Sequence, residues 1–114
     1  MEKNLGKTTT GLQPNIAALL SYLAGFITGI IFFLIEKENK FVRFHAMQSL
    51  ITFGAVFVMQ VFFSILPFIG NLLIPILGLA SLILWIFCMV KAYQGEMFKL
   101  PVAGDIAEQQ SQRS

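Results

Sequence analysis

Two long stretches of the sequence carry no charged residue, and they limit the folds that are open to this chain. They cover residues 8–35 and 44–90, with lengths of 28 and 47 residues. A transmembrane helix needs about 20 predominantly apolar residues to cross a hydrocarbon core of about 30 Å. The first stretch therefore holds one span. A single helix over the second would extend roughly 70 Å, so that stretch must fold back on itself.

Turn-forming residues indicate where the second stretch reverses. Pro67 lacks the amide hydrogen that a helix interior needs, and Gly70 and Asn71 tolerate left-handed backbone angles. Pro75 suits the first turn of a new helix. We therefore predict an all-α, polytopic integral membrane protein with three transmembrane helices and a tight apolar hairpin between the second and third. The predicted spans are 16–35, 46–66 and 72–93, in a transmembrane domain of residues 14–95 between polar tails at 1–13 and 96–114.

The composition excludes several classes of protein. Charged residues make up 12% of the chain and hydrophobic residues 56%, whereas soluble domains usually carry about 25% charged residues. The net charge of +2 is too small for a nucleic-acid footprint. The single cysteine, Cys88, cannot form an internal disulfide and is expected to be a small buried hydrophobe. The lipid bilayer is the expected surrounding, and nucleic acid is not an expected partner.

The distribution of Lys and Arg suggests an orientation. With three spans, the segment 36–43 and the C-terminal tail share one face of the membrane. That face carries five basic residues and the other face two, which are respectively Lys37, Lys40, Arg43, Lys91 and Lys99, and Lys3 and Lys7. The positive-inside rule then predicts an extracellular N-terminus and a cytoplasmic C-terminus in a bacterial plasma membrane.

Small residues recur at every fourth position of the first predicted span. They are Ala17, Ser21, Gly25 and Gly29. On one helix this spacing forms a stripe, and small side chains let helix backbones approach closely within lipid. The stripe is expected to contact either another helix of this chain or a second copy of it.

A polar face is predicted at the start of the second span. His45, Gln48, Ser49 and Thr52 are spaced i, i+3, i+4 and i+7, which places them on one side of a helix, just after Arg43. Polar groups at this depth should face protein or water. His45 could accept a proton or bind a ligand, or it could hydrogen-bond a neighbouring helix end. We expect the face to pack inside the bundle against the C-terminal end of the third span.

Motifs for chemistry are missing from the sequence. One histidine cannot supply a two-histidine metal site, and no Walker lysine, zinc-protease helix or nucleophile elbow occurs. We therefore predict no enzyme, no cofactor and no catalytic or metal-binding residues. The expected role is an interaction or scaffold subunit that associates with itself or with another membrane protein. The alternative is a multi-copy pore or translocation component, with a lining drawn from Gln48, Ser49, Thr52, Gln60 and Ser64.

Four segments of the chain carry a resemblance to a known family. They read LSYLAG at 20–25, FVRFHAMQS at 41–49, KAYQGE at 91–96 and LPVAGDIA at 100–107. Over about residues 14–108 the chain resembles small bacterial and archaeal membrane proteins with a domain of unknown function. These are grouped with the chloroplast inner-envelope Tic import component and with related magnetosome membrane proteins. The resemblance implies an integral membrane protein of three or four helices and no catalytic residues.

Overall fold

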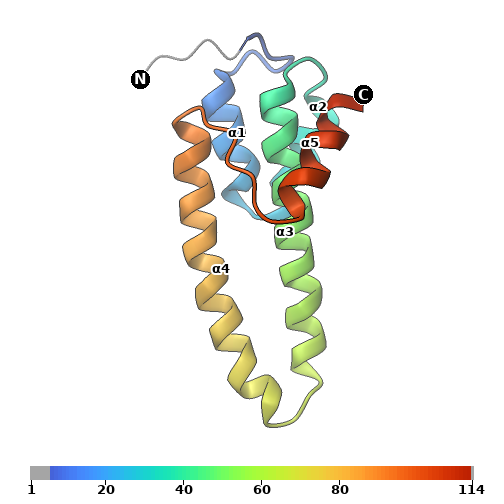
Figure 1. Ribbon diagram of the computed structural model, residues 1–114, viewed down its shortest axis with the longest axis vertical. Helices are drawn as coiled ribbons and strands as arrows, with labels where there is room; N and C mark the ends of the chain where they lie inside the picture. Colours follow the sequence, from blue (N-terminus) through green and yellow to red (C-terminus); the bar gives the residue numbers. More distant parts are fainter. Residues whose placement is uncertain (1–5, 114) are drawn as a thin grey trace.

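The described part of the chain is helical, with no strand. The computed structural model describes residues 6–113, with side chains up to Ser111. The helices are α1 (Pro14–Leu23), α2 (Phe26–Ile35), α3 (Lys40–Ser64), α4 (Ile69–Tyr93) and α5 (Ala103–Arg113). Helices α3 and α4 form one long antiparallel hairpin, and the three short helices gather around the end of it that lies away from the turn (Figure 1).

The α3–α4 hairpin turns close to the predicted place but has longer helices than expected. Helix α3 begins at Lys40 because the Asn39 side chain caps it, accepting a hydrogen bond from the Val42 N–H at 3.0 Å. Helix α4 begins at Ile69, so Pro75 lies inside the helix and not in its first turn. At Gly70 any Cβ would collide with the Phe63 carbonyl oxygen, so the glycine permits the tight reversal. Both helices have 25 residues and are long and apolar enough to cross a membrane.

The first predicted span, 16–35, is wrong as a single transmembrane helix. It is broken into α1 and α2, each of 10 residues and about 15 Å long, which reverse direction at Ala24 and Gly25. Gly25 adopts φ +63°, a left-handed conformation that glycine reaches without a steric penalty. Of the helices in the described residues, two are therefore able to span the bilayer, not three.

The short α1–α2 hairpin brings the two ends of that segment together. The Thr9 N–H donates to Glu36 Oε2 at 2.7 Å, and Asn39 Nδ2 donates to the Lys7 carbonyl at 3.1 Å. Asn15 Nδ2 also donates to the Tyr93 carbonyl at the end of α4, at 3.0 Å. The prediction that the N-terminal tail and segment 36–43 lie on opposite membrane faces is therefore wrong. A hairpin that enters and leaves on one face does not cross the membrane. The basic residues before and after it therefore count toward the same face.

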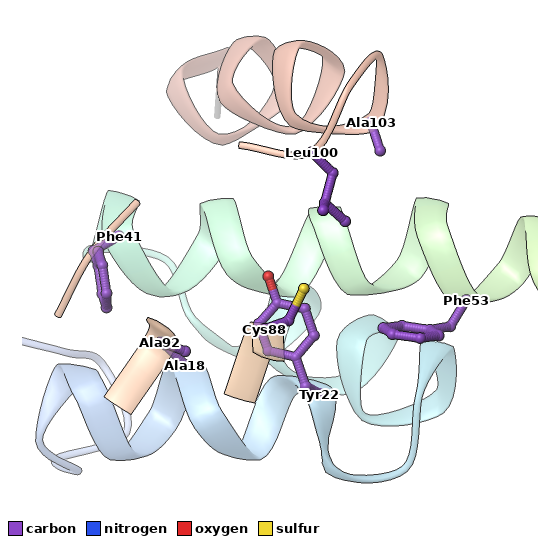
Figure 2. Close-up of a cluster of buried hydrophobic side chains, with 8 residues drawn as sticks. All are labelled: Ala18, Tyr22, Phe41, Phe53, Cys88, Ala92, Leu100 and Ala103. Atoms are coloured by element: carbon purple, nitrogen blue, oxygen red, sulfur yellow. The ribbon is translucent and has the colours of Figure 1, made fainter. Parts of the chain in front are cut away.

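The buried core lies in the half of the molecule that contains the short helices. Helices α1 and α4 contact each other and both contact α3, while α2 packs between α1 and α3. Figure 2 shows the Tyr22 ring pointing from α1 into this core beside Cys88 of α4. Cys88 is buried, so the prediction of a buried cysteine is confirmed. The core cluster consists of Ala18, Tyr22, Phe41, Phe53, Cys88, Ala92, Leu100 and Ala103.

The C-terminal residues, described above as a polar tail, include a docked helix. Residues 94–102 run back along α3 without regular structure. Helix α5 then returns toward the end of the molecule that lies away from the α3–α4 turn (Figure 1). Its buried side is made of small residues, Ala103, Gly104, Ala107 and Ser111. Of the helices in the described part of the chain, α5 contacts α3 only.

Glu36 ties the N-terminal segment to the start of α3. Its Oε2 accepts hydrogen bonds from the N–H groups of Thr9, Glu38 and Asn39 at 2.7, 3.1 and 3.1 Å. Burial raises the pKa of this carboxyl, but these hydrogen bonds outweigh it, so the pKa lies below the ordinary value. The charged form is thus favoured by the folded state.

Replacing Glu36 with glutamine is expected to destabilise the protein by about 1 kcal/mol at neutral pH, because charge-assisted hydrogen bonds become neutral ones. The Glu36 contribution is fully present above the unfolded-state pKa and is lost as the pH falls through the lower folded-state pKa. Thermal unfolding in detergent should therefore show a gap between wild type and Glu36→Gln that closes on acidification. A gap that is constant with pH would contradict a role for the carboxylate charge.

Candidate functional site

The predicted polar face of α3 is buried in the bundle. Arg43, His45, Gln48 and Ser49 are all buried, and Thr52 is half-buried. The hydrogen bonds of His45, Gln48 and Ser49 do not go to α4 itself. The face lies against residues 96–100, which follow α4, and against the break between α1 and α2.

His45 joins three parts of the chain through both of its ring nitrogens. Nε2 lies 2.8 Å from the Glu96 carbonyl oxygen, and Nδ1 lies 2.7 Å from the Tyr22 hydroxyl. A carbonyl oxygen can only accept, so Nε2 carries the proton and Nδ1 accepts from Tyr22. Rings of Phe41, Phe44 and Tyr22 meet the imidazole edge-on at centroid distances of 4.7 to 5.4 Å. Both nitrogens of the neutral ring are thus occupied.

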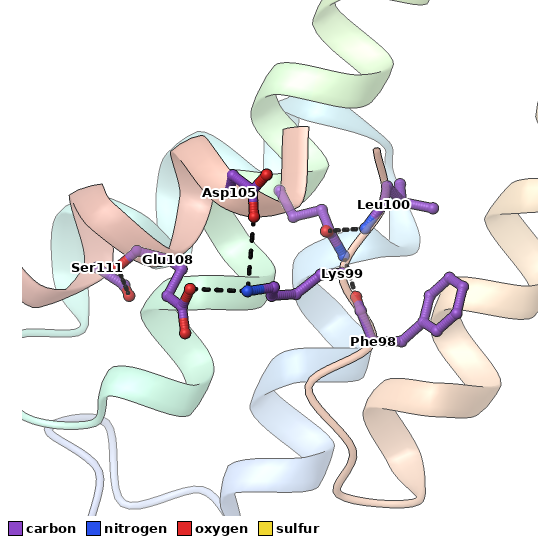
Figure 3. Close-up of polar contacts among 7 residues, drawn as sticks. Phe98, Lys99, Leu100, Asp105, Glu108 and Ser111 are labelled. Atoms are coloured by element: carbon purple, nitrogen blue, oxygen red, sulfur yellow. Dashed lines mark hydrogen bonds and ion pairs between the residues drawn. The ribbon is translucent and has the colours of Figure 1, made fainter. Parts of the chain in front are cut away.

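Gln48 holds residues 98–100 by their backbone. Its Nε2 donates to the Phe98 carbonyl and to the Tyr22 hydroxyl, each at 2.9 Å. Its Oε1 accepts from the Leu100 N–H at 2.9 Å. Figure 3 shows the hydrogen bonds made by Phe98 and Leu100, where the chain passes α3 before α5 begins. Every donor hydrogen of the amide has a partner, and its oxygen accepts one, so Gln48 fixes the path of the C-terminal segment.

Ser49 belongs to a second polar group, which surrounds the break between α1 and α2. Ser49 Oγ donates to the Gly25 carbonyl at 2.9 Å, and Trp85 Nε1 donates to the Tyr22 carbonyl at 2.5 Å. Thr28 Oγ1 donates to the Ser21 carbonyl at 3.0 Å and accepts from the Ala24 N–H at 3.1 Å. Non-helical backbone at membrane depth is tolerated only where such partners replace water. These side chains make the break possible.

Arg43 closes the other end of α2. Its Nη1 donates to the Phe33 carbonyl at 3.0 Å and to the Glu36 carbonyl at 2.7 Å. The guanidinium also lies 4.1 Å from the centroid of the Phe33 ring. The last carbonyls of a helix lack intrahelical partners and carry partial negative charge, so a cation there is stabilising. Arg43 therefore acts as a C-terminal cap for a helix that comes before it in the chain.

The four small residues of the predicted stripe lie on two helices and on the break between them. Ala17 and Ser21 are buried in α1, Gly25 is half-buried at the break, and Gly29 is buried in α2. At Gly29 a Cβ would come within 2.8 Å of the Ala46 carbonyl oxygen and 2.9 Å of the Leu50 nitrogen. Of the two glycines of the stripe, Gly29 is therefore the one in close backbone contact, and this contact joins α2 and α3 of the same chain.

Sequence reasoning missed several residues that complete the site. Tyr22, Thr28 and Trp85 lie inside segments that the sequence predicts as continuous transmembrane spans, and none of them is part of the predicted polar face. The only local signal was Gly25, followed three residues later by a hydroxyl that can bond backbone groups. Asn39 and Glu36 were visible as a polar loop, and their capping role depends on the start of α3.

The described residues of the site contain no metal-binding cluster. No group of three or more His, Cys, Asp and Glu side chains there could hold a metal ion. Two grooves of about 350 and 400 Å³ flank the core, lined mainly by apolar side chains of α3 and α4 and their neighbours. The hydrogen bonds of Arg43, His45, Gln48 and Ser49 go mostly to backbone groups of the same chain.

Comparison with known proteins places the chain in a family. The model of the magnetosome magnetite crystal formation protein family matches residues 7–107. The chain belongs to this family. Its match extends from the N-terminal segment that contacts Glu36 into α5, so it includes all of the contacts described above.

Curated relatives are named as membrane proteins. A UPF0132 membrane protein of Methanocaldococcus jannaschii is 56% identical over 108 residues, which cover 95% of this chain and 97% of the relative. A UPF0132 membrane protein of Archaeoglobus fulgidus is 59% identical over 99 residues, covering 87% and 96%. No solved structure matches the chain. Together with two helices long enough to span a bilayer, these names identify a membrane protein of an uncharacterised family.

Proposed function

We propose that the protein is a non-enzymatic scaffold subunit of the membrane that associates with copies of itself through α5. Two observations support this role. The polar groups that could have served catalysis or ligand binding are occupied by the backbone of the same chain. In addition, one side of the molecule carries polar groups at a depth where its other sides are apolar.

The polar side is formed by Lys99, Asp105, Glu108 and Gln109, which we call the α5 polar face. Lys99 Nζ lies 2.9 Å from Glu108 Oε1 and 3.5 Å from Asp105 Oδ1 (Figure 3). The Asp105 side chain nevertheless remains 72% exposed. Leu100, next to Lys99, bonds Gln48 and so fixes the depth of this face along α3.

Helix α2 presents the opposite character at the same depth. Gly29 of α2 packs against residues 46–50 of α3, the level of Gln48. Outward from it, Ile27, Ile30 and Ile31 are exposed. Lipid suits these isoleucines, but charged groups at that depth need protein or water. The contrast between the two sides is the observation that carries the proposal.

A second copy is a fitting partner for the α5 polar face, because the face carries both signs of charge. Two copies related by a twofold axis present the same patch to each other, and a patch with mixed charges complements itself. Association through this face would remove Asp105 and Glu108 from contact with lipid.

Self-association is tested by crosslinking in native membranes. In a Cys88→Ser background, Gln109→Cys should form dimers with a short bis-maleimide reagent, because the α5 polar faces meet. Ile30→Cys, at a similar depth on the lipid-facing side of α2, is the matched control and should remain monomeric. Dimers formed at Ile30 and not at Gln109 would place the contact on α2 and contradict the proposal.

The alternative function is a multi-copy pore or translocation component, as the resemblance to the Tic component implies. It is favoured if the α5 polar faces of several copies surround water. The structure supports it less, because Gln48 and Ser49 are turned inward and bonded. Purified protein in liposomes should conduct no ions under the scaffold proposal. A flux that Asp105→Ala abolishes would favour the pore.

We infer that both tails face the cytoplasm at the plasma membrane. Five basic residues lie near the end of the molecule opposite the α3–α4 turn, namely Lys7, Lys37, Lys40, Arg43 and Lys91. The turn itself, at 65–68, lies within the uncharged stretch 44–90. Such an imbalance places the basic end inside.

This topology predicts equal protection of the two ends of the α1–α2 segment. In the Cys88→Ser background, Lys7→Cys and Lys37→Cys should resist an impermeant thiol reagent in intact cells and react after permeabilisation. Labelling of Lys7→Cys in intact cells, with Lys37→Cys protected, would restore a three-span topology.

A further inference from the structure

The cross-section of the molecule changes abruptly halfway along α3 and α4. The break at Gly25 lies beside Phe53, Phe26 at the start of α2 packs against Phe57, and residues 100–103 line a groove with Ala55 and Leu84. Beyond that level only α3 and α4 continue, as two helices that converge on the turn (Figure 1). One half of the length therefore contains parts of five helices and the other half two.

The narrow half has the length of one lipid leaflet. The parts of α3 and α4 that continue alone are 58–64 and 69–81, which at 1.5 Å per residue extend about 10 to 20 Å. Half of a 30 Å hydrocarbon core is about 15 Å. Side chains along this part, such as Val58, Phe62, Leu72 and Leu79, are apolar and exposed. The narrow half is therefore suited to the far leaflet.

The broad half is embedded in lipid as well. The outward side of α2 exposes Ile27, Ile31 and Leu34, and α4 exposes Ile83, Ile86 and Val90 at corresponding heights. From Ile69 to Val90 the exposed apolar side of α4 covers about 32 Å, the thickness of the whole core. The near leaflet thus surrounds the short helices as well as the ends of α3 and α4.

We propose that the protein is a wedge that favours and stabilises curved membrane, with the broad end in the convex leaflet. Each helix with its side chains is about 10 to 12 Å across, so the near leaflet accommodates roughly twice the protein area of the far leaflet. Hydrocarbon cannot leave an empty volume beside the narrow half. Lipids of the far leaflet close around two helices while those of the near leaflet are spread by five, and bending the bilayer relieves the difference.

The half-membrane α1–α2 hairpin is the main source of this asymmetry. Its two helices expand one leaflet without adding a crossing, because the chain returns at Gly25 and leaves beside Thr9. Its shape is held by Ser49 and Trp85 from the spanning helices, so the broad end is rigid. Self-association through α5 is not needed for this effect, although in an oligomer the bending effects of neighbouring copies would add.

The test measures sorting of the full-length protein between a giant vesicle and a thin membrane tether pulled outward from it. The protein carries Lys37→Cys in the Cys88→Ser background and is reconstituted at low density in both orientations. An impermeant dye labels molecules whose broad end faces out. In a second sample, outer cysteines are first blocked with a colourless impermeant reagent and a permeant dye then labels the opposite orientation.

The two orientations must sort in opposite directions. Relative to a lipid tracer, molecules with the broad end outside should be enriched in the tether, with a ratio above unity. Molecules with the broad end inside should be depleted, with a ratio below unity. Equal ratios in the two samples, whether at unity or above it, would overturn the proposal. The comparison uses one folded protein in both samples, so loss of folding cannot produce the expected reversal.

Discussion

Replacing Gln48 with leucine is expected to destabilise the protein by about 3 to 5 kcal/mol and to release the C-terminal segment. The substitution removes three hydrogen bonds and leaves the Phe98 carbonyl and the Leu100 N–H without partners against α3. Each unsatisfied buried group costs about 1 to 3 kcal/mol. Thermal unfolding in detergent measures the loss, and limited proteolysis within 94–102 measures the release.

Gln60→Leu is the matched control on the same helix. Gln60 makes a single hydrogen bond, from Nε2 to the Ile74 carbonyl at 3.2 Å, and its Oε1 has no partner among the described residues. Its replacement should change stability by about 1 kcal/mol or less. Similar losses for the two variants would mean that Gln48 does not hold the segment that leads to α5.

Gly29→Ala is expected to weaken the packing of α2 on α3 and to lower stability by about 2 kcal/mol. The new Cβ would approach backbone atoms of Ala46 and Leu50 to within 3 Å, and backbone cannot move aside as a flexible side chain can. This loss should exceed the gain of about 1 kcal/mol that alanine brings to a helix. Thermal unfolding and cellular abundance are suitable measurements.

Gly54→Ala makes the same chemical change where space is available. A Cβ at Gly54 would lie 3.9 Å from the Phe26 Cβ, which is an ordinary contact. This variant should be neutral or slightly stabilised, because only the helix-propensity gain remains. If both alanines were tolerated equally, α2 and α3 would not be in close contact at Gly29.

The spanning hairpin could be predicted from the sequence because its signals are local. An uncharged stretch of 47 residues must fold back, and Pro67 and Gly70 lie where it does. The break between α1 and α2 could not be predicted in this way. Residues 16–35 are apolar enough for a continuous span, and the break depends on hydrogen bonds from Ser49 and Trp85, which are distant in sequence. At this position, hydrogen bonds to residues distant in sequence decide the backbone path, and the local hydropathy does not.

The candidate site was predictable as a face but not as a network. Helical spacing placed His45, Gln48 and Ser49 together, and all three are buried side by side. Their partners are mostly backbone atoms of residues 96–100 and Gly25, and backbone atoms leave no mark in a sequence. The docking of α5 was missed for a related reason, since its small buried residues have little hydrophobicity.

The break between α1 and α2 also constrains how the protein is made. A chain leaves the ribosome from its N-terminus, so α1 and α2 emerge first. Trp85, which satisfies the Tyr22 carbonyl, follows 63 residues later, and Ser49 follows Gly25 by 24. Until those side chains arrive, the backbone at the break has only the partners that residues 21–29 supply, and it lacks the hydrogen bonds from Ser49 and Trp85. The half-membrane hairpin can therefore reach its final form only after the last spanning helix has been synthesised, and maturation of the fold in the membrane is a late, post-insertion step.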